Sequence, residues 1–276
     1  MVAAMAGFAL EDMVLKAASR QMPLGQVLLV FGLLGMAAFA VMARRERLFT
    51  YALFSRGMAV RSVFELAGRL FYALAVALTP LSVASAILQA TPLLVVGAAA
   101  VLFGERVDWR RWLAVGCGFG GVLMILRPGL AGFDALSLLA VAGMIGFAGR
   151  DLATRAAPPS LSNAQLGVAG FSVLALSGGI LLGISGGAVW PDAAGLGLLA
   201  TVTVFGVAAY AALTGAMRNG EVSVVTPFRY TRLVFGLVLG VAVFGERPDL
   251  MTLLGSAVIV AAGIYTLTQG RRIGSR

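Results

Sequence analysis

The sequence contains no histidine and only one cysteine among its 276 residues. The absence of histidine excludes a His-based catalytic triad, a haem held by a histidine and the usual zinc sites. Cys117 cannot form a disulfide within the chain, and in the stretch GCGFGG we expect it to be a small buried residue. The sequence therefore predicts neither a bound metal nor a cofactor.

Charged residues are scarce as well. They make up 12% of the chain, whereas 60% of the residues are apolar and the mean hydropathy is +0.96. This leaves too little polar surface to cover a water-soluble globule. Apolar stretches of about 20 residues, the length of a bilayer-spanning helix, recur along the chain. We expect an all-α integral membrane protein with ten transmembrane helices, at residues 1–19, 24–43, 60–78, 81–103, 111–127, 136–155, 161–185, 194–217, 222–244 and 251–269.

The arginines are unevenly distributed between the loops. Counted from a cytoplasmic N-terminus, the loops on that side and the tail contain Arg44, Arg45, Arg47, Arg56, Arg106, Arg110, Arg111, Arg218, Arg271, Arg272 and Arg276. The opposite side keeps little more than Arg20, Arg127 and Arg247. This positive-inside pattern predicts a multi-pass protein of the inner (plasma) membrane with both termini in the cytoplasm. The net charge of +9 therefore reflects topology, and the expected partner is the lipid bilayer, with no nucleic acid.

Two segments of the first half of the chain recur in the second half. GFALEDMVLKAA at residues 7–18 returns as GFAGRDLATRAA at residues 146–157. The segment LSVASAILQATPLLVVGAAAVLFGERVD at 81–108 aligns without a gap with VSVVTPFRYTRLVFGLVLGVAVFGERPD at 222–249, and both copies end in FGER-x-D. The chain is therefore interpreted as an internal duplication.

The duplication predicts an inverted arrangement. Each half contains five expected helices, and an odd number makes the second copy enter the membrane from the opposite side. We therefore expect one membrane domain made of two inverted five-helix repeats, residues 1–133 and 134–276, with a substrate site between them near mid-membrane. Pro92 and Pro227 do not align between the copies, so their kinks are expected at different depths.

The sequence resembles the EamA-type drug/metabolite transporter superfamily. The resemblance covers nearly the whole chain and is based on the two FGER-containing segments, GERVDWRRWLAVGCGFGGVLMI and GERPDLMTLLGSAVIVAAGIYTL, and on ALAVALTPLSVASAILQATPLL. It implies ten helices, cytoplasmic termini, a central cavity lined by the first four helices of each half, and alternating access. Exporters of aromatic amino acids of the YddG type are one branch that it resembles.

Glu11 and Asp12 lie close to the middle of the first expected helix. An ionised carboxylate that faces lipid there would cost several kcal/mol, so both side chains are expected to face protein or water. In one interpretation, a carboxylate binds a proton or a cationic group of the substrate. In the other, the two acids pair with Arg150 and with Arg69 or Arg229 and hold the repeats together. The sequence leaves both interpretations open.

Two further acids, Glu65 and Asp151, complete the candidates for proton coupling. Glu65, Arg69 and Tyr72 follow one face of the third expected helix, where Glu65 and Arg69 form a favourable local pair. We expect Tyr72 to contact the substrate, together with Arg150, which takes the place of Glu11 in the second copy.

Small polar side chains form a matching stripe in the two copies of the fourth helix. Ser85 and Gln89 in the first copy align with Thr226 and Tyr230 in the second. We expect these four side chains to line a shared cavity. Helix packing alone is the alternative, because hydroxyls in membrane helices often bond to nearby carbonyls.

Arg229 and Arg232 lie three residues apart in the ninth expected helix. They either neutralise the buried acids, or Arg229 binds a carboxylate of the substrate, for which the guanidinium geometry is suited. Aromatic side chains could hold an apolar part of the substrate: Phe71, Tyr72, Phe147, Tyr210, Phe228 and Tyr230.

Two other motifs indicate structural roles. Glu105 and Glu246 of the FGER segments are expected to cap a helix or form an ion pair near the membrane surface. Gly116 and Gly120 have the GxxxG spacing that permits close helix approach, within one chain or between two.

The function predicted from the sequence is secondary transport, without enzymatic activity. The expected substrates are small amphipathic metabolites, with amino acids, including aromatic ones, favoured, and the expected direction is export. Proton antiport and facilitated diffusion both remain open, as do a monomer and a homodimer. Two alternatives are an intramembrane enzyme with an acid dyad made from Glu11, Asp12, Asp151 or Glu65, and a lipid flippase or scaffold of the same fold.

Overall fold

The computed structural model describes residues 1–43, 50–103, 109–127, 134–154, 161–219 and 226–274. All regular elements in these ranges are helices. The α-helices are α1 (Val2–Ala18), α2 (Leu24–Met42), α3 (Arg56–Leu78), α4 (Leu81–Leu88), α5 (Thr91–Phe103), α6 (Trp109–Leu126), α7 (Ser137–Thr154), α8 (Asn163–Ser185), α9 (Ala193–Asn219), α11 (Thr231–Phe244) and α12 (Leu250–Gly274). Two short 3₁₀ helices are η1 (Tyr51–Phe54) and η2 (Thr226–Tyr230). Each helix expected from the sequence has a counterpart among them.

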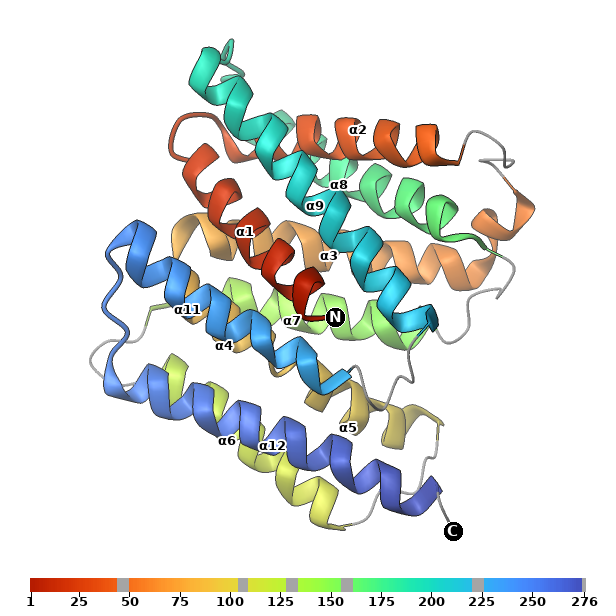
Figure 1. Cartoon of the computed structure of the whole chain (residues 1–276), viewed down its shortest axis with the longest axis vertical. Coiled ribbons are helices and arrows are strands. Elements are labelled where there is room, and N and C mark those ends of the chain that lie inside the picture. The colour runs from red at the N-terminus through yellow and green to blue at the C-terminus, as the bar shows by residue number, and fades with distance from the viewer. Residues whose placement is uncertain (44–49, 104–108, 128–133, 155–160, 220–225, 275–276) are drawn as a thin grey trace.

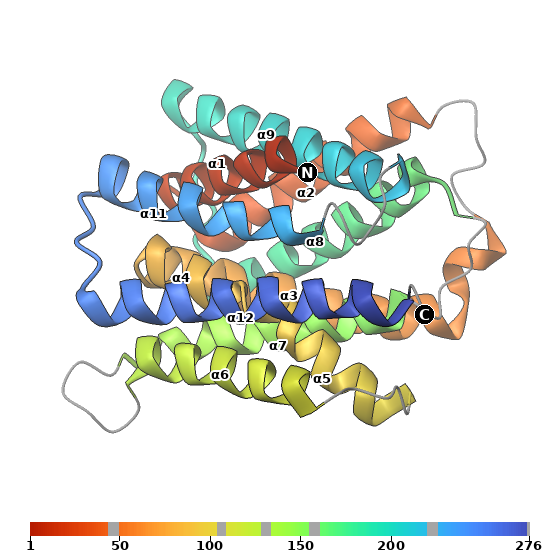
Figure 2. The same cartoon turned by 60° about the horizontal axis from the view of Figure 1, so that its bottom comes forward.

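The helices run side by side in one bundle, with α6 and α12 along one edge (Figures 1 and 2). Within the described residues, four spans are both long and apolar enough to cross a membrane: Leu24–Met42, Leu81–Leu102, Asn163–Ser185 and Ala193–Ala216. Large apolar side chains such as Leu33, Leu34, Val101 and Val204 are exposed on the outside of the bundle. An apolar outer surface of this kind suits contact with lipid tails. The all-helical class predicted from the sequence is therefore confirmed.

The closest helix pairs join elements from the two halves of the chain. They are α2 with α8, α3 with α7, α6 with α12, α1 with α9, α1 with α11, and α4 with α11. The first helix of each half, α1 or α7, thus packs against the third expected helix of the other half, α9 or α3. The two halves are interleaved, so a cavity at the centre of the bundle has walls from both.

Glycines permit the tightest of these contacts. A Cβ on Gly178 of α8 would clash with the backbone of Leu29 in α2, and a Cβ on Gly146 of α7 would clash with the backbone of Gly68 in α3. Such close approach of small residues is a common way to pack helices in lipid.

The fourth expected helix is interrupted, since α4 ends at Leu88 and α5 begins at Thr91. In the aligned segment of the second copy, the 3₁₀ helix η2 ends at Tyr230 and α11 begins at Thr231 without a gap. Pro92 lies inside the first turn of α5, where a missing N–H is tolerated. Different depths for the kinks at Pro92 and Pro227 stay a prediction.

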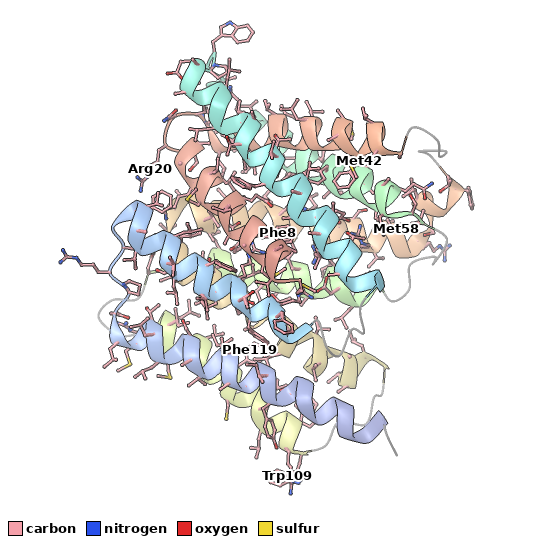
Figure 3. The ribbon with its side chains drawn as sticks, in the orientation of Figure 1. Phe8, Arg20, Met42, Met58, Trp109 and Phe119 are labelled. Atoms are coloured by element: carbon pink, nitrogen blue, oxygen red, sulfur yellow. The ribbon has the colours of Figure 1, made fainter. Side chains whose placement is uncertain are left out.

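The outer edge of α6 also differs from expectation. Cys117, expected to be buried, is exposed. A Cβ on Gly116 or Gly120 would meet nothing within 4 Å, whereas one on Gly121 would meet the backbone of Gly255 in α12. The glycine that allows α6 to approach α12 is therefore Gly121, and the GxxxG face points outward. Trp109, at the start of α6, lies at the periphery of the molecule (Figure 3).

Candidate functional site

A cavity lies at the centre of the bundle, with about 110 Å³ open to the centres of water molecules. Its walls come from α1, α2, α3, α4, α5, α7, α8, α9, η2 and α11, and thus from both halves of the chain. The volume holds several waters. Phe8 of α1, one of its lining residues, lies near the middle of the molecule in Figure 3.

Most of the site residues predicted from the sequence lie on the cavity wall. These are Glu11, Asp12, Tyr72, Gln89, Phe147, Arg150, Tyr210 and Arg229. They are far apart in sequence and come from six different helical segments or their ends. The folded chain therefore brings charged, amide and aromatic side chains to one place.

The remaining predicted residues lie elsewhere. Ser85 is buried against Gly236 of α11, and the Tyr230 hydroxyl packs against Gly263 of α12. Both lie at contacts between helices and are not on the cavity wall, whereas Gln89 of the same stripe lines the cavity. The side chain of Thr226 lies outside the described part of the chain. Glu65 and Asp151 are not on the cavity wall, but both form ion pairs with Arg150, which is.

Asp12 is tightly held at one side of the cavity. Its Oδ2 accepts a hydrogen bond from Nη2 of Arg232 at 2.6 Å and another from the Tyr72 hydroxyl at 3.1 Å. The Arg232 guanidinium lies 5.1 Å from the centre of the Phe8 ring and 5.5 Å from that of Tyr72. Asp12 is only 3% exposed. Both donors, one of them an arginine, bind the same oxygen and thereby hold the carboxylate between α3 and α11.

Glu11, the adjacent residue, is held much more loosely. Its Oε1 lies 3.9 Å from Nη1 of Arg69, beyond hydrogen-bond distance. Its Oε2 is buried and has no hydrogen-bond partner among the described residues. A buried carboxylate oxygen without a donor is costly, so this atom is well placed to accept a hydrogen bond from a bound molecule.

Glu65 of α3 is completely buried and shared by three arginines. Its carboxylate lies 2.9 Å from Arg61, 3.9 Å from Arg69 and 4.0 Å from Arg150. Because Arg150 comes from α7, the cluster links the first helix of the second half to the third helix of the first. The expected local pair between Glu65 and Arg69 is therefore present, but the closest partner of Glu65 is Arg61.

Asp151 of α7 forms the counterpart of Asp12 in the second copy. Its Oδ1 accepts hydrogen bonds from Nε and Nη2 of Arg150 at 3.0 and 2.8 Å, and its Oδ2 lies 3.8 Å from Arg229. Its side chain is 25% exposed. The two aligned aspartates, Asp12 and Asp151, thus have different surroundings.

The ion pairs partly match those expected from the sequence. Glu11 pairs with Arg69, as one interpretation has it, but Arg150 pairs with Asp151 and Glu65 instead of Glu11 or Asp12. Sequence reasoning named Arg69 and Arg232 only as ion-pair partners, yet both line the cavity. Arg232 aligns with Thr91 of the first copy, which the structure also places on the cavity wall.

The arrangement differs from an acid dyad. Each of the four carboxylates described above has an arginine as its charged neighbour, and no two of them share a hydrogen bond in the described part of the chain. Acid dyads work through two carboxyls that share one proton. The site is built instead as a set of carboxylate–guanidinium pairs around a small hollow.

An all-helical bundle with an apolar outer surface and a charged internal cavity defines a membrane protein that accommodates a small polar molecule. The model of the EamA-like transporter family matches this sequence twice, over residues 1–127 and 133–268. The chain belongs to the EamA-like transporter family.

Three relatives illustrate the range of this similarity. The S-adenosylmethionine uptake transporter of Rickettsia felis is 24% identical over 199 residues, covering 72% of this chain and 67% of that protein. The riboflavin transporter of Rhizobium johnstonii is 27% identical over 197 residues, covering 71% and 65%. The pseudopaline exporter CntI of Pseudomonas aeruginosa is 26% identical over 263 residues, covering 93% and 90%. The matches thus span about two thirds of the first two proteins and nine tenths of the third.

A solved crystal structure aligns over 97% of this chain and 98% of its own length, with a TM-score of 0.64 and 19% sequence identity. This similarity shows a shared fold. The family match and the named relatives indicate that the chain is a membrane protein and a transporter of small molecules.

Proposed function

We propose that this protein exports amino acids, aromatic ones among them, across the inner membrane by alternating access. The observation that carries the proposal is the central cavity, whose wall contains both arginines and Glu11, a residue with a buried carboxylate oxygen that has no hydrogen-bond partner among the described residues. A zwitterion offers an ammonium group for the acid and a carboxylate for an arginine. The rings of Phe8, Phe31 and Phe147 supply an apolar wall for a side chain.

The transport mechanism that we propose is a rocking of two inverted repeats, residues 1–133 and 134–276. Two observations support it. The family model matches each half separately, and the first helix of each half packs against the third expected helix of the other. In transporters of this design the substrate site lies between the repeats, where this cavity lies.

Two observations support the proposed direction of transport and the proposed orientation in the membrane. The relative that aligns over nine tenths of both chains is named as an exporter, whereas the uptake transporter aligns over about seven tenths of this chain. The arginine distribution favours cytoplasmic termini. This topology puts Arg106 and Arg247 on opposite faces of the membrane, and an impermeant reagent should label cysteines at the two positions from opposite sides. Labelling from the same side would contradict the topology.

The central test is transport by the purified protein in proteoliposomes. We expect exchange of labelled L-phenylalanine against unlabelled amino acids inside the vesicles. Glu11→Gln should reduce it at least about tenfold, because an amide cannot attract an ammonium as a carboxylate does. Asp134→Asn, which removes a carboxylate from an exposed loop, is the matched control and should transport like the wild type. Lack of exchange for a full panel of amino acids by well-folded protein would refute the proposed substrate class.

The same proteoliposomes can show whether transport is coupled to a proton gradient. If a carboxylate of the cavity carries a proton, an imposed pH gradient drives substrate accumulation in the wild type and not in the variant that lacks that carboxylate. Asp12→Asn and Glu11→Gln should be compared in this assay. Equal exchange with and without a gradient would identify facilitated diffusion.

A further inference from the structure

The arginines of the charged network are not held equally. Three of them have a carboxylate oxygen within 3 Å: Arg232 at 2.6 Å, Arg150 at 2.8 Å and Arg61 at 2.9 Å. The nearest carboxylates of Arg69 lie 3.9 Å away, on Glu11 and on Glu65. Arg69 therefore has attractive neighbours but no hydrogen bond to either of them.

Arg69 is nevertheless buried. Its side chain is 12% exposed, and its Nε has no hydrogen-bond partner among the described residues. The guanidinium lies 5.9 Å from the centre of the Phe171 ring, which offers only a weak cation–π contact. A guanidinium has five N–H donors and is costly to leave unsatisfied away from water.

The charge balance of the network points the same way. It contains five arginines (Arg61, Arg69, Arg150, Arg229 and Arg232) and four carboxylates (Glu11, Asp12, Glu65 and Asp151). One positive charge is therefore in excess among these described residues. Glu65 is already shared with Arg61 and Arg150, so Arg69 is the buried arginine with the least neutralisation.

Arg69 also lines the cavity, beside Glu11 and one helical turn from Tyr72. We propose that Arg69 binds the carboxylate of the substrate and sets the preference of the transporter for molecules that carry a carboxylate. A planar guanidinium can bind a carboxylate through two parallel hydrogen bonds, which the long contacts to Glu11 and Glu65 do not provide. When it does so, Glu11 is released from its ion pair with Arg69 and can bind the substrate ammonium.

This inference rests on the proposed function and names the residue that recognises one end of the substrate. Arg229 is the natural comparison, because it also lines the cavity and its nearest carboxylate, on Asp151, lies 3.8 Å away. Its side chain is 27% exposed, more than twice as much as that of Arg69. Water can satisfy Arg229, so the buried Arg69 gains more from a carboxylate.

The test compares an amino acid with its amide. Wild-type protein in proteoliposomes should exchange L-phenylalanine with a KM far below that for L-phenylalaninamide. In Arg69→Gln, the KM for the acid should rise about 10- to 100-fold while that for the amide stays within about threefold, because only the charged hydrogen bonds are lost. Arg69→Lys, which keeps the charge without the planar fork, should lie between the two. Arg229→Gln removes one charge from the same cavity and should keep the wild-type ratio of acid to amide.

The outcomes separate the two levels of the proposal. If the wild type exchanges phenylalanine but Arg69→Gln and Arg69→Lys keep the ratio of acid to amide, the role of Arg69 is refuted and the transport function stands. If Arg229→Gln loses the ratio instead, the carboxylate site belongs to Arg229. If the wild type exchanges no amino acid, the proposed function fails and this inference fails with it. Should Arg69→Gln not fold, the ratio in Arg69→Lys decides.

A separate observation concerns one end of the cavity. Lys16 of α1 follows Leu15, which lines the cavity, and its ammonium lies 3.5 Å from Oε1 of Glu246, which follows α11. Lys16 also donates a hydrogen bond to the carbonyl of Thr79, at the end of α3. Arg20, two residues after the end of α1 and labelled at the edge of the molecule in Figure 3, lies 4.9 Å from the ring of Phe244.

Glu246 holds a third element at this end. Its Oε1 accepts a hydrogen bond from the backbone N–H of Leu81 at 2.6 Å, and its Oε2 accepts one from Ser82 at 2.9 Å. These are the first two N–H groups of α4, which have no partner within their own helix. The role expected for Glu246, capping or pairing, is thus present, and it joins α11 of the second half to α1 and α4 of the first.

We infer that the contact of Lys16 and Glu246 with the start of α4 is a latch that closes this end of the cavity. Opening the cavity here requires α1 and α4 to separate from the end of α11, which breaks the ion pair and both hydrogen bonds. A weaker latch therefore shifts the population towards the state that is open at this end.

Cysteine accessibility tests the latch. The background is Cys117→Ala with Ala73→Cys, because Ala73 lines the cavity and is buried. In this background, Lys16→Met should raise the rate of labelling by an impermeant maleimide about fivefold, and only from the side where α1 ends. Arg20→Met removes a neighbouring charge that does not contact Glu246, and it should leave the rate within about twofold of the background.

Glu246→Gln, which keeps an acceptor oxygen for α4 but loses the charge, should raise the rate less than Lys16→Met does. Unchanged labelling in both variants, or an equal rise in Arg20→Met, would refute the latch. A rise from the opposite side would refute it as well.

Discussion

Asp12 and Asp151 occupy equivalent positions in the two copies of the duplicated segment, yet they have different surroundings. Asp12 is 4% exposed at its side chain and holds Arg232 of α11 and the hydroxyl of Tyr72. Asp151 is 25% exposed and holds the adjacent Arg150, with Arg229 further away. The difference shows that duplication preserved the acid but not its partners, because Arg232 has a threonine, Thr91, at its aligned position in the first copy. The first copy therefore contributes to a buried ion pair between two helices, Asp12 with Arg232, whereas the second contains a partly exposed pair, Asp151 with Arg150.

The largest expected effect on stability comes from breaking the ion pair of Asp12 and Arg232. Asp12→Ala leaves the Arg232 guanidinium buried without its carboxylate, and breaking a buried ion pair in this way costs about 3–5 kcal/mol. Asp151→Ala should cost less, since Asp151 is itself 25% exposed and Arg150 keeps a second carboxylate, that of Glu65, 4.0 Å away. Thermal unfolding of the purified protein in detergent measures both variants. Equal losses of stability would mean that the two environments do not differ in energy.

A double variant sharpens this result. Asp12→Ala with Arg232→Met removes both charges, and replacing a buried ion pair with apolar groups is often neutral or stabilising. We expect the double variant to regain most of the stability lost in Asp12→Ala. A double variant as unstable as the single one would show that the loss comes from packing rather than from the stranded arginine.

A smaller effect is expected at the hydroxyl that supports Asp12. Tyr72→Phe removes one hydrogen bond to a charged acceptor, worth about 1.5–3 kcal/mol, and leaves Arg232 in place. Tyr210→Phe is the control, because its hydroxyl donates to a neutral carbonyl, that of Leu166, at 3.2 Å. We expect the unfolding temperature to fall more for Tyr72→Phe than for Tyr210→Phe. The reverse order would contradict the stronger contribution expected from the hydrogen bond to Asp12.

The smallest effect is expected at a third aspartate, Asp249, which lies outside the membrane helices and is 49% exposed. It accepts a hydrogen bond from the backbone N–H of Thr252 at 2.8 Å and pairs with Arg127. The Thr252 N–H, and after it Arg127, lower the pKa of this carboxyl from its ordinary value. Loss of the helix cap in Asp249→Ala should cost about 1 kcal/mol.

The sign of the pH dependence at Asp249 follows from this lowered pKa. Its stabilisation is complete above the pKa of the unfolded chain and is lost as the pH falls through that of the folded protein. Unfolding midpoints of wild type and Asp249→Ala should therefore converge in acid and separate near neutral pH. High salt should narrow the gap, because the pair with Arg127 is exposed. A gap that widens in acid would contradict the assignment.

Much of the fold could be predicted from the sequence because lipid imposes a simple constraint. A helix that satisfies its own backbone and exposes apolar side chains leaves a recognisable run of residues, and all such runs became helices. Exact ends were harder to predict. The third expected helix begins at Arg56 rather than at residue 60, since Ser55 caps it by accepting a hydrogen bond from the N–H of Met58.

The types of residue in the candidate site could be predicted from the sequence, but their ion-pair partners could not. Buried carboxylates and arginines must meet in a membrane protein, which is why Glu11, Asp12 and Arg229 could be assigned to the interior. Their partners depend on how each helix is rotated about its axis, and this is set by packing between segments far apart in the chain. Ser85 and Tyr230 were misplaced for that reason: the rotation turned them towards Gly236 and Gly263 instead of the cavity.

The replacement of Thr91 by Arg232 across the aligned segments has a consequence for how a carrier of this kind would operate. Two halves that exchange roles during a transport cycle would give isoenergetic end states only if they were chemically identical. Here one half contributes a cation and the other a hydroxyl at the same level. Without substrate, the protein would therefore populate one of its two conformational states more than the other. This difference in population would give the transport cycle a preferred starting state even when the substrate concentration is equal on both sides of the membrane.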